Sequence, residues 1–342
     1  MSQRLVVGID IAKKDFAVAY RVGEAEVELG KFANDVTGFK QLQEALESAC
    51  QAHGVSQIQL ILEATGGYEA ALMVYAYEQG WGVSMPNPKQ VRDWAKGVGY
   101  RVKTDRVDAR ILAHYGVAPS GHPRPPLRPQ LAVEVSQLDS LLKRRQDLEQ
   151  ALQKEQTRLS EMAGRPGMAP QVIESLQQVI ESLTAALAGI QQAIDELCQQ
   201  HGYLHQNLQR LLALPGVGPK VVLPLLVKLL QWQNLTAGEG DASGLVAFIG
   251  LDPQPYDSGR SVHKHPGISK MGDSELRRLL YMGALGGVRG HNPLKAFYQR
   301  LVGRGKAKKV ALVAAGRKIL VWAWAIFSQQ IDWNPEFHQI GA

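Results

Sequence analysis

Two aspartates, Asp105 and Asp108, stand three residues apart at the start of a segment with helical periodicity. On a helix, such positions are neighbours with Cβ atoms about 5–6 Å apart. Two carboxylates at that spacing repel each other unless a cation or a proton lies between them. The pair therefore indicates either a metal site or a solvated helix start, in which the flanking Lys103, Arg106 and Arg110 form salt bridges with it.

Two further acids end apolar, strand-like runs: Asp10 follows residues 5–9 and Glu63 follows residues 58–62. Open α/β sheets place ligand sites at the carboxyl ends of their strands. Four carboxylates from three elements are able to hold two Mg²⁺ ions about 3.5–4 Å apart, and oxygen ligands suit Mg²⁺. This layout is the one expected of a ribonuclease-H-like fold. We predict Asp10, Glu63, Asp105 and Asp108 as catalytic Mg²⁺ ligands.

A competing interpretation concerns residues 8–14, which are similar to the phosphate loop of sugar-kinase and actin-like ATPases. Those loops need a glycine and a small hydroxyl residue after the aspartate, so that backbone amides approach the phosphate. Ala12 and Lys14 occupy these positions here. The substitution disfavours ATP binding.

The predicted acids belong to an α/β domain over residues 1–115. Its expected strands are 5–9, 16–20, 27–32, 58–62 and 81–85, and its expected helices are 39–52, 69–79 and the one that begins at Asp105. Residues 116–130 carry five prolines, a density that forbids helix and favours extended chain. We interpret this segment as a linker between domains.

Residues 131–200 have the pattern of helices in a coiled coil. From Ile173 to Leu197, apolar residues recur at alternating steps of three and four, over nearly four heptads. An isolated apolar seam of this length would be unstable in water, so it must have a partner. The pattern allows an antiparallel hairpin between two helices of this region or dimerisation of the second helix.

A mostly helical domain is expected over residues 201–342. It begins with two helical runs joined by Pro215–Gly218, which resemble a helix-hairpin-helix motif. In that motif, glycines let backbone N–H groups at a helix start face a DNA phosphate, although the same hairpin also serves as a simple helix corner. Residues 243–251 and 274–282 are expected to be helical, and residues 252–272 are expected to form a loop. A long basic helical stretch is expected to follow residue 282 and to reach about residue 327.

Positive charge is concentrated late in the chain. The net charge is +6, yet residues 258–320 hold 14 lysines and arginines against Asp273 and Glu275 alone. Such a segment indicates a phosphate-binding surface rather than a merely soluble basic face. Nearby His263 and His265 lack a cysteine or third histidine at ligand spacing, so they indicate phosphate or base contacts rather than a metal, and no particular role is assigned to them.

Several protein classes are disfavoured by composition. Cys50 and Cys198 lie far apart, which indicates neither a disulfide framework nor a zinc motif. The N-terminus lacks a signal-peptide layout, and the apolar run 319–327 is too short to span a bilayer. We expect a cytoplasmic protein without a membrane partner.

Taken in order, these segments resemble the DEDD transposases of the insertion-sequence 110/1111 family, which are bridge-RNA-guided serine recombinases. The matching segments are 8–13, 62–68, 104–109, 214–218, 250–253, 258–259, 268–272 and 276–280. The resemblance covers nearly the whole chain. Each piece alone is common, but the ordered set is highly specific.

The resemblance implies that the four acids are the DEDD set of a RuvC-like domain and that Ser258 is the nucleophile of a C-terminal transposase domain. Composition alone does not select Ser258, because several nearby serines are equally plausible: Ser243, Ser261, Ser269 and Ser274. The resemblance also implies a dimer or tetramer assembled through the helical middle, in which one subunit's RuvC-like domain completes a site with another subunit's Ser258. A non-coding RNA from the element would pair with donor and target DNA.

The expected reaction is attack by Ser258 on a DNA phosphate with Mg²⁺ assistance, which leaves a phosphoserine link. The predicted nucleic-acid contacts are Gly216, Gly218, Lys220, Arg260, Lys264, Lys270, Arg277 and Arg278. We expect the protein to be associated with the nucleoid. Two alternatives stay open: a Mg²⁺-dependent RuvC-type junction nuclease that uses water, and a non-catalytic nucleic-acid scaffold whose acids are structural.

Overall fold

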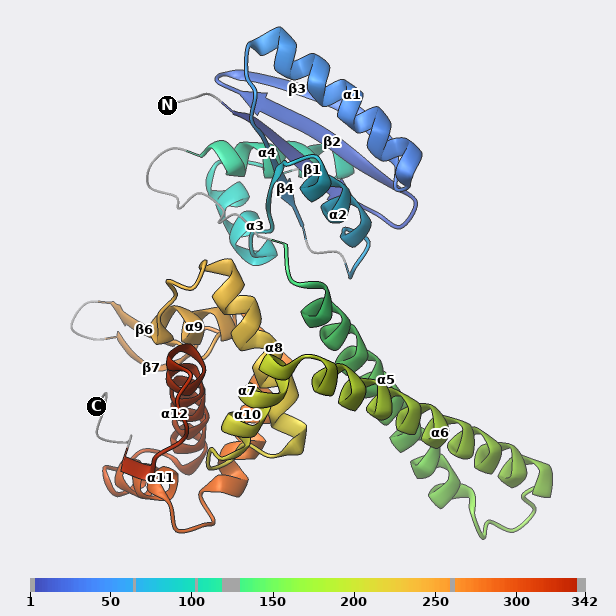
Figure 1. Cartoon of the computed structure of the whole chain (residues 1–342), viewed down its shortest axis with the longest axis vertical. Coiled ribbons are helices and arrows are strands. Elements are labelled where there is room, and N and C mark those ends of the chain that lie inside the picture. Colours follow the sequence, from blue (N-terminus) through green and yellow to red (C-terminus); the bar gives the residue numbers. More distant parts are fainter. Residues whose placement is uncertain (1–3, 64–65, 102–103, 119–129, 259–261, 337–342) are drawn as a thin grey trace. The chain divides into compact units, whose positions relative to one another are not determined.

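The computed structural model describes residues 4–63, 66–101, 104–118, 130–258 and 262–336. The chain divides into two compact units, residues 1–130 and residues 131–342. Each unit, drawn as a ribbon in Figure 1, has its own hydrophobic core. The first contains a mixed sheet with helices and the second is mainly helical, so the predicted α/β plus α class is confirmed.

The first unit is built on a five-stranded sheet in the order β3-β2-β1-β4-β5. β1 pairs antiparallel with β2, and β2 pairs antiparallel with β3, whereas β1, β4 and β5 run parallel. The strands are β1 (Leu5–Ile11), β2 (Asp15–Val22), β3 (Ala25–Ala33), β4 (Ile58–Leu62) and β5 (Gly82–Ser84). All five strands coincide with runs predicted from the sequence.

Alternation along β1 sends its side chains into two different cores. Leu5, Val7 and Ile9 pack with α1 (Val36–His53) and α2 (Ala70–Glu78) on one face of the sheet. Val6 packs on the opposite face, with α3 (Pro88–Gly97) and α4 (Asp105–Val117). The strand therefore has helices on both faces, which explains why its sequence is an almost continuous apolar run.

Helix α4 crosses β1 in direct backbone contact. A Cβ atom on Gly8 would lie 2.0 Å from the carbonyl oxygen of Ala109 and 2.3 Å from the amide nitrogen of Ala113. Further along the helix, a Cβ on Gly116 would lie 2.5 Å from a methyl group of Val6. Glycine at these two positions thus brings α4 onto the strand, and the order of contacts shows that the helix runs antiparallel to β1.

The second unit begins with two long helices, α5 (Val133–Met162) and α6 (Pro170–Gln200), which lie side by side as an antiparallel hairpin (Figure 1). Its remaining elements are α7 (Gly202–Leu212), α8 (Pro219–Leu235), α9 (Ala242–Ile249), β6 (Pro253–Ser258), β7 (Val262–Ile268), α10 (Ser274–Gly287), α11 (Pro293–Gly303) and α12 (Lys308–Gln329). The apolar seam of α6 faces α5 but is covered unevenly. Ile194 and Leu197 are buried near the base of the hairpin, while Leu183 and Leu187 are only half-buried.

Helix α12 is the apolar centre of the second unit. Its 22 residues are long and apolar enough to cross a membrane by length and composition, but 61% of the most apolar window is buried inside the protein. Ile319, Leu320 and Phe327 are among the buried side chains that join the core of this unit. The helix begins well before the apolar run at 319–327. Its first residues are mostly polar and lie at the surface.

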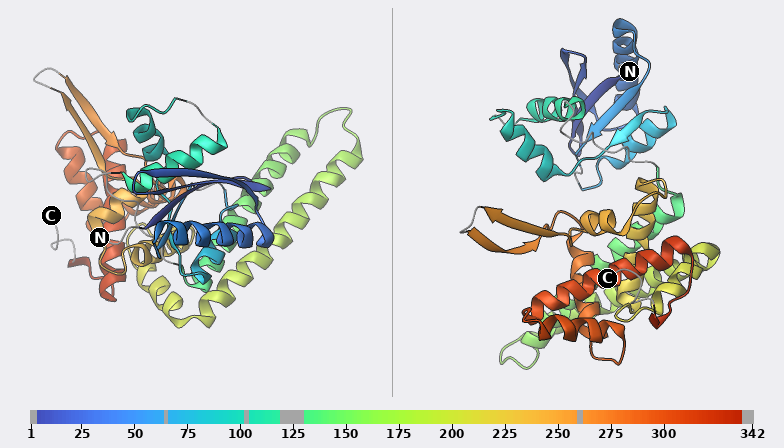
Figure 2. Two further views of the ribbon diagram at one scale, coloured as in Figure 1. Left: turned by 90° about the horizontal axis from the view of Figure 1, so that it is seen from above. Right: turned by 90° about the vertical axis from the view of Figure 1, so that its left-hand side faces the viewer.

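Two expectations for the second unit were wrong. Residues 252–272 are not simply a loop, since β6 and β7 pair antiparallel and extend away from the helices as a ribbon (Figure 2). This segment escaped prediction because its prolines, glycines and histidines resemble a loop and it lacks the apolar alternation of a half-buried strand. The long basic stretch expected after residue 282 is not one continuous helix: α10 ends at Gly287, Asn292 caps α11, and Gly305, with a φ of 83°, precedes α12.

Asp273 offers a test of the packing between α8 and α10. Its carboxylate caps α10 by accepting a hydrogen bond from Leu276 N–H at 2.9 Å and lies 3.0 Å from Lys228 Nζ on α8. Burial opposes ionisation of Asp273, but the Lys228 ammonium and the backbone N–H groups outweigh it, so the pKa of Asp273 is lowered below its ordinary value of 3.8.

We expect Asp273→Asn to lower the free energy of unfolding by about 1–2 kcal/mol at pH 7, because asparagine keeps the cap but loses the charge. A lowered folded-state pKa stabilises the protein above the unfolded-state pKa, and this stabilisation is lost as pH falls through the folded-state pKa. The difference between wild type and variant should therefore shrink below about pH 4 in urea denaturation. A difference that stays constant down to pH 3 would contradict this account.

Candidate metal centre and nucleic-acid groove

Asp10 and Glu63 come to the same edge of the sheet. In the parallel pair β1–β4, Ile9 is aligned with Leu62, so the next residues along the two strands are Asp10 and Glu63. Alternation places Asp10 on the face of Gly8, and it places Glu63 on the face of Ile61. Asp10, the penultimate residue of β1, and Glu63, which directly follows β4, therefore lie at the ends of adjacent parallel strands, on the side that α3 and α4 cover.

Asp105 and Asp108 lie in the first turn of α4. Thr104 caps this helix, because its hydroxyl accepts a hydrogen bond from Val107 N–H at 3.3 Å. Since α4 runs antiparallel to β1, its first turn lies toward the strand end that carries Asp10. The partial positive charge of a helix N-terminus also favours carboxylates there.

Two of the four acids form ion pairs with basic side chains of the first unit. Lys31 Nζ, on β3, lies 2.6 Å from Asp105 Oδ2 and 3.5 Å from Asp15 Oδ1. The hydrogen bond from Lys31 is the main reason that the pKa of Asp105 is lowered. Arg92, on α3, lies 3.3 Å from Glu63 Oε1. The acids near the carboxyl ends of β1 and β4 thus attract basic side chains from two different elements, β3 and α3.

The donor set fits a divalent cation in its chemistry. All four side chains offer carboxylate oxygens, which Mg²⁺ prefers, and two of them already bind a cation of the chain itself. Within the ranges that the structure describes, however, no three His, Cys, Asp or Glu side chains gather closely enough to hold a metal ion. The assignment of Asp10, Glu63, Asp105 and Asp108 as ligands stays a prediction.

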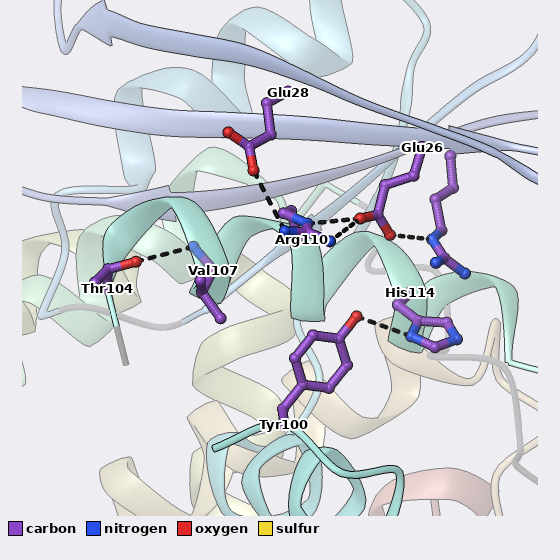
Figure 3. A network of polar contacts seen from close by, with 8 residues as sticks. Glu26, Glu28, Tyr100, Thr104, Val107, Arg110 and His114 are labelled. Carbon is purple, nitrogen blue, oxygen red and sulfur yellow. Dashed lines mark hydrogen bonds and ion pairs between the residues drawn. The ribbon is translucent and has the colours of Figure 1, made fainter. Parts of the chain in front are cut away.

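A cluster of ion pairs fastens α4 to the edge strand β3 (Figure 3). Arg110 lies 2.5 Å from Glu26 and 3.5 Å from Glu28, and Arg21 also lies 2.6 Å from Glu26. Burial opposes ionisation of Glu26, but hydrogen bonds from Arg21 and Arg110 outweigh it and lower the pKa of Glu26. On the other side of the helix, Tyr100 pairs with His114 at 3.1 Å. These contacts connect the middle and the last turn of α4 to neighbouring elements.

We expect Arg110→Met to lower the free energy of unfolding by about 1–2 kcal/mol, because the charged hydrogen bonds to β3 are lost while the aliphatic stem is kept. Arg106→Met provides a matched control, since Arg106 is exposed on the same helix. Urea denaturation of both variants measures the difference. Equal stabilities would show that the Arg110 ion pairs contribute nothing to fastening the helix.

A cavity of about 840 Å³ opens in the second unit between α5, α8, α10 and the loop that joins α7 to α8. It brings together four of the predicted nucleic-acid contacts: Gly216, Gly218, Lys220 and Arg278. Two basic residues of α5 that the sequence analysis did not select, Lys143 and Arg145, also line it. We call this cavity the α5–α8–α10 groove.

The two glycines of the α7–α8 loop have different roles. Gly216 has a φ of 87°, and a Cβ there would lie 2.7 Å from the carbonyl oxygen of Gly283 on α10, so this glycine allows the loop to pack closely. Gly218 precedes α8 without a side-chain cap, and a Cβ on it would meet nothing within 4 Å. Gly216 thus serves the helix corner, whereas Gly218 leaves the start of α8 open to the groove.

The other predicted contacts are dispersed. Arg277 donates a hydrogen bond to the carbonyl oxygen of Ile249 at 2.9 Å, and Arg278 pairs with Glu275. Lys270 is exposed, with a left-handed φ of 56°. Arg260 lies outside the described residues.

Ser258 is the last residue of β6 and is aligned with Val262 of β7. Lys264 lies on β7, opposite Tyr256. The side chains of Ser258 and Lys264 lie outside the described part of the structure. The backbone thus places Ser258 in the second unit, on a ribbon, while the four predicted metal ligands belong to the first.

An α/β unit with carboxylates at the carboxyl ends of its strands, joined in the same chain to a basic helical unit, is the organisation expected of a DNA-processing protein. The comparisons identify the family. The DEDD transposase model of insertion sequence 110, described as "Transposase", matches residues 7–163, and the model "Transposase IS116/IS110/IS902 family" matches residues 208–299. The chain belongs to this transposase family, so the family membership expected from the sequence is confirmed.

Relatives match nearly the whole chain. The chain is 30% identical over 334 residues to the "Pilin gene-inverting protein" of Moraxella bovis, covering 97% of this chain and 98% of the relative. The protein of the same name from Moraxella lacunata matches with the same identity and coverage. A "Probable family 20 transposase" of Pseudomonas aeruginosa is 27% identical over 186 residues, covering 52% of this chain and 50% of that protein.

Proposed function

We propose that this transposase cuts and exchanges DNA strands through a covalent phosphoserine intermediate, that Mg²⁺ assists it, and that an RNA from the element guides it. The observation that carries the proposal is the position of Asp10 and Glu63 at adjacent parallel strand ends, with Asp105 and Asp108 in the first turn of the helix crossing the same face. The sheet order β3-β2-β1-β4-β5 supports a RuvC-like fold for this unit.

The division of labour between the two units follows from their chemistry. The four carboxylates would hold Mg²⁺, which would neutralise the charge that develops on the scissile phosphate. Ser258 would attack that phosphate in line, forming an oxygen–phosphorus bond while the bond to the leaving sugar oxygen breaks. The phosphoserine link keeps the energy of the original phosphodiester, so that joining to another strand needs no ATP.

The α5–α8–α10 groove supports binding of a nucleic-acid backbone. Its lining includes Lys220, together with Lys143 and Arg278, which pair with Asp139 and Glu275 of the same groove. The open start of α8 lies beside Gly218. Backbone contacts of this kind hold DNA or RNA without reading its sequence. In our proposal, base pairing to the guide RNA supplies sequence choice, as in other RNA-guided systems. Arg260, Lys264, Lys270 and Arg277 would add further phosphate contacts.

Oligomerisation is supported by the uneven burial of the α6 seam. Leu183 and Leu187 stay half-buried although α5 packs along the helix. A second copy of the hairpin would cover these side chains more fully, and the apolar heptad pattern allows such an assembly. In the proposed assembly, the α/β unit of one subunit works with Ser258 of another. We place this dimer or tetramer in the cytoplasm, on nucleoid DNA.

The guide is tested by expressing the protein from its native locus with flanking DNA, purifying it and sequencing the nucleic acid that accompanies it. One discrete RNA from the flank, with loops complementary to the element ends and to a target, is the expected result. Random cellular RNA, or none, would contradict guidance while leaving the metal site and the covalent step open to their own tests.

A structural role for the acids is the second candidate, and a specific observation favours it: Asp105 and Glu63 already pair with Lys31 and Arg92. In that case the protein would be a nucleic-acid scaffold. Titration calorimetry with Mn²⁺ as a Mg²⁺ substitute separates the two functions. Saturable binding with defined stoichiometry supports the enzyme, and heat of dilution alone supports the scaffold.

A further inference from the structure

Asn34 joins two loops that are distant in sequence. The residue lies directly after β3, and its side-chain Nδ2 donates hydrogen bonds to the carbonyl oxygens of Ala12 and Tyr68, each at 3.1 Å. Its backbone N–H donates to the carbonyl oxygen of Lys14 at 2.9 Å. One residue thus makes three hydrogen bonds to backbone carbonyl groups of the two segments.

The two segments are those that leave the acidic strand ends. Ala12 comes two residues after Asp10, and Tyr68 comes five residues after Glu63. Direct strand pairing between β1 and β4 extends only as far as Ile9 and Leu62. Beyond that point the Asn34 amide is a link between the two chain segments that does not depend on the strand ladder.

The chemistry of the link requires a primary amide. Bridging two carbonyl oxygens takes two N–H hydrogens on one nitrogen, which an amide has and a carboxylate lacks. The bridge also determines the orientation of the side chain, since a flipped amide would set its oxygen against both carbonyl oxygens. In that orientation Oδ1 is buried and has no hydrogen-bond partner among the described groups.

A buried acceptor without a partner lowers the stability of the folded state, and among the described groups Oδ1 has none. The Asn34 bridge is not required for the turn after β1, which could form without a link to the β4 loop. Stability of the sheet alone therefore does not explain why the unsatisfied acceptor is kept. Unsatisfied buried polar atoms are few in native proteins, and each one calls for a specific explanation. The position of Asn34 between the segments that follow Asp10 and Glu63 indicates that explanation.

We propose that Asn34 is a positioning residue that sets the separation of the Asp10 and Glu63 strand ends for binding a divalent cation. The inference rests on the proposed function, since it takes these two acids as cation ligands. Asn34 itself touches neither substrate nor metal in this proposal. It acts through the backbone of the two loops.

The test uses the full-length protein, with Mn²⁺ as the probe in titration calorimetry. Asn34→Ala removes both hydrogen bonds. Asn34→Asp keeps the shape, removes the two donors and adds a negative charge. By electrostatics alone, the aspartate would tighten Mn²⁺ binding, whereas loss of positioning weakens it. We expect both variants to raise the Mn²⁺ dissociation constant about tenfold or more, as loss of a group that orients metal ligands does.

Gln43→Ala is the matched control. Gln43 accepts a hydrogen bond from the Tyr75 hydroxyl at 2.5 Å, between the helices on the opposite face of the sheet. We expect this variant to lower the melting temperature, because the hydrogen bond from Tyr75 is lost, and to leave the Mn²⁺ dissociation constant unchanged. Circular dichroism of each variant verifies that the sheet unit is folded before the titration.

The outcomes separate the inference from the proposed function. If wild type binds Mn²⁺ and both Asn34 variants bind it within twofold of wild type, the positioning role is wrong and the metal site stands. Tighter binding by Asn34→Asp also overturns the positioning role. If wild type binds no Mn²⁺, the metal site itself is wrong, and the role of Asn34 falls with it.

Discussion

Replacing Ser258 by alanine is expected to abolish the covalent protein–DNA adduct and strand exchange while nucleic acid remains bound. The hydroxyl oxygen is the proposed attacking atom, and alanine removes it without adding bulk. Loss of a nucleophile typically lowers the rate about 10⁴-fold or more, because positioning and charge stabilisation cannot replace the missing bond-forming atom. Ser258 lies at the end of β6, on an antiparallel ribbon outside the helical core, so the variant should stay folded.

The measurement is a denaturing gel of end-labelled donor DNA after incubation with protein, guide RNA and Mg²⁺. Ser274→Ala is the matched control, because Ser274 is exposed at the start of the nearby α10 and should keep the adduct. An adduct formed by Ser258→Ala would refute the assignment of the nucleophile. Cutting without an adduct would instead identify water as the nucleophile and the protein as a RuvC-type nuclease.

The strands of the first unit were predictable because short-range patterns determine them. Burial of β1 and β4 on both faces requires continuous apolar runs, and the position of Asp10 and Glu63 after those runs then follows from parallel pairing. The antiparallel partner β2 was also evident from its apolar run. Positions of acids at strand ends are thus available from sequence, once the strands are recognised.

The cations beside the acids were not predictable. Lys31 and Asp105 are 74 residues apart in the chain and meet only because α4 packs beside β3. Arg92 reaches Glu63 through the packing of α3 on the sheet, which no local pattern specifies. Asn34 was missed for the same reason, since its two carbonyl partners come from loops 22 and 34 residues away.

In the second unit, too, contacts between segments distant in sequence were not predictable. The heptad pattern of α6 required an apolar partner, and α5 supplies part of it, but periodicity could not show how deeply each position is buried. The α5–α8–α10 groove depends on long-range packing that places Lys143 beside the loop at Gly218. The β6–β7 ribbon is formed by backbone pairing of strands whose sequence lacks apolar alternation, so no periodic pattern indicated it.

Replacing Asp105 by asparagine is the second change with a large expected effect. Asparagine keeps the size of the side chain and removes its charge, so a cation loses one of its four proposed carboxylate ligands. We expect strand cleavage to fall by about 10³-fold or more and the Mn²⁺ dissociation constant to rise at least about tenfold. The carboxylate is exposed, with 58% of its side chain accessible, and exposed ion pairs contribute little to stability. The variant should therefore fold and bind nucleic acid as wild type does.

Lys31→Met is the control that separates a metal ligand from half of a salt bridge. It removes the same ion pair from the other side while leaving all four carboxylates in place. If Asp105 serves a metal, Lys31→Met should keep Mn²⁺ binding or tighten it, because a competing cation has gone, whereas Asp105→Asn should lose it. If the pair is purely structural, both variants should leave Mn²⁺ affinity unchanged, and Lys31→Met should lower the melting temperature at least as much as Asp105→Asn, because it also removes the ion pair with Asp15. Calorimetry and thermal denaturation of this one pair of variants thus decide between the catalytic and the structural role of the acidic helix start.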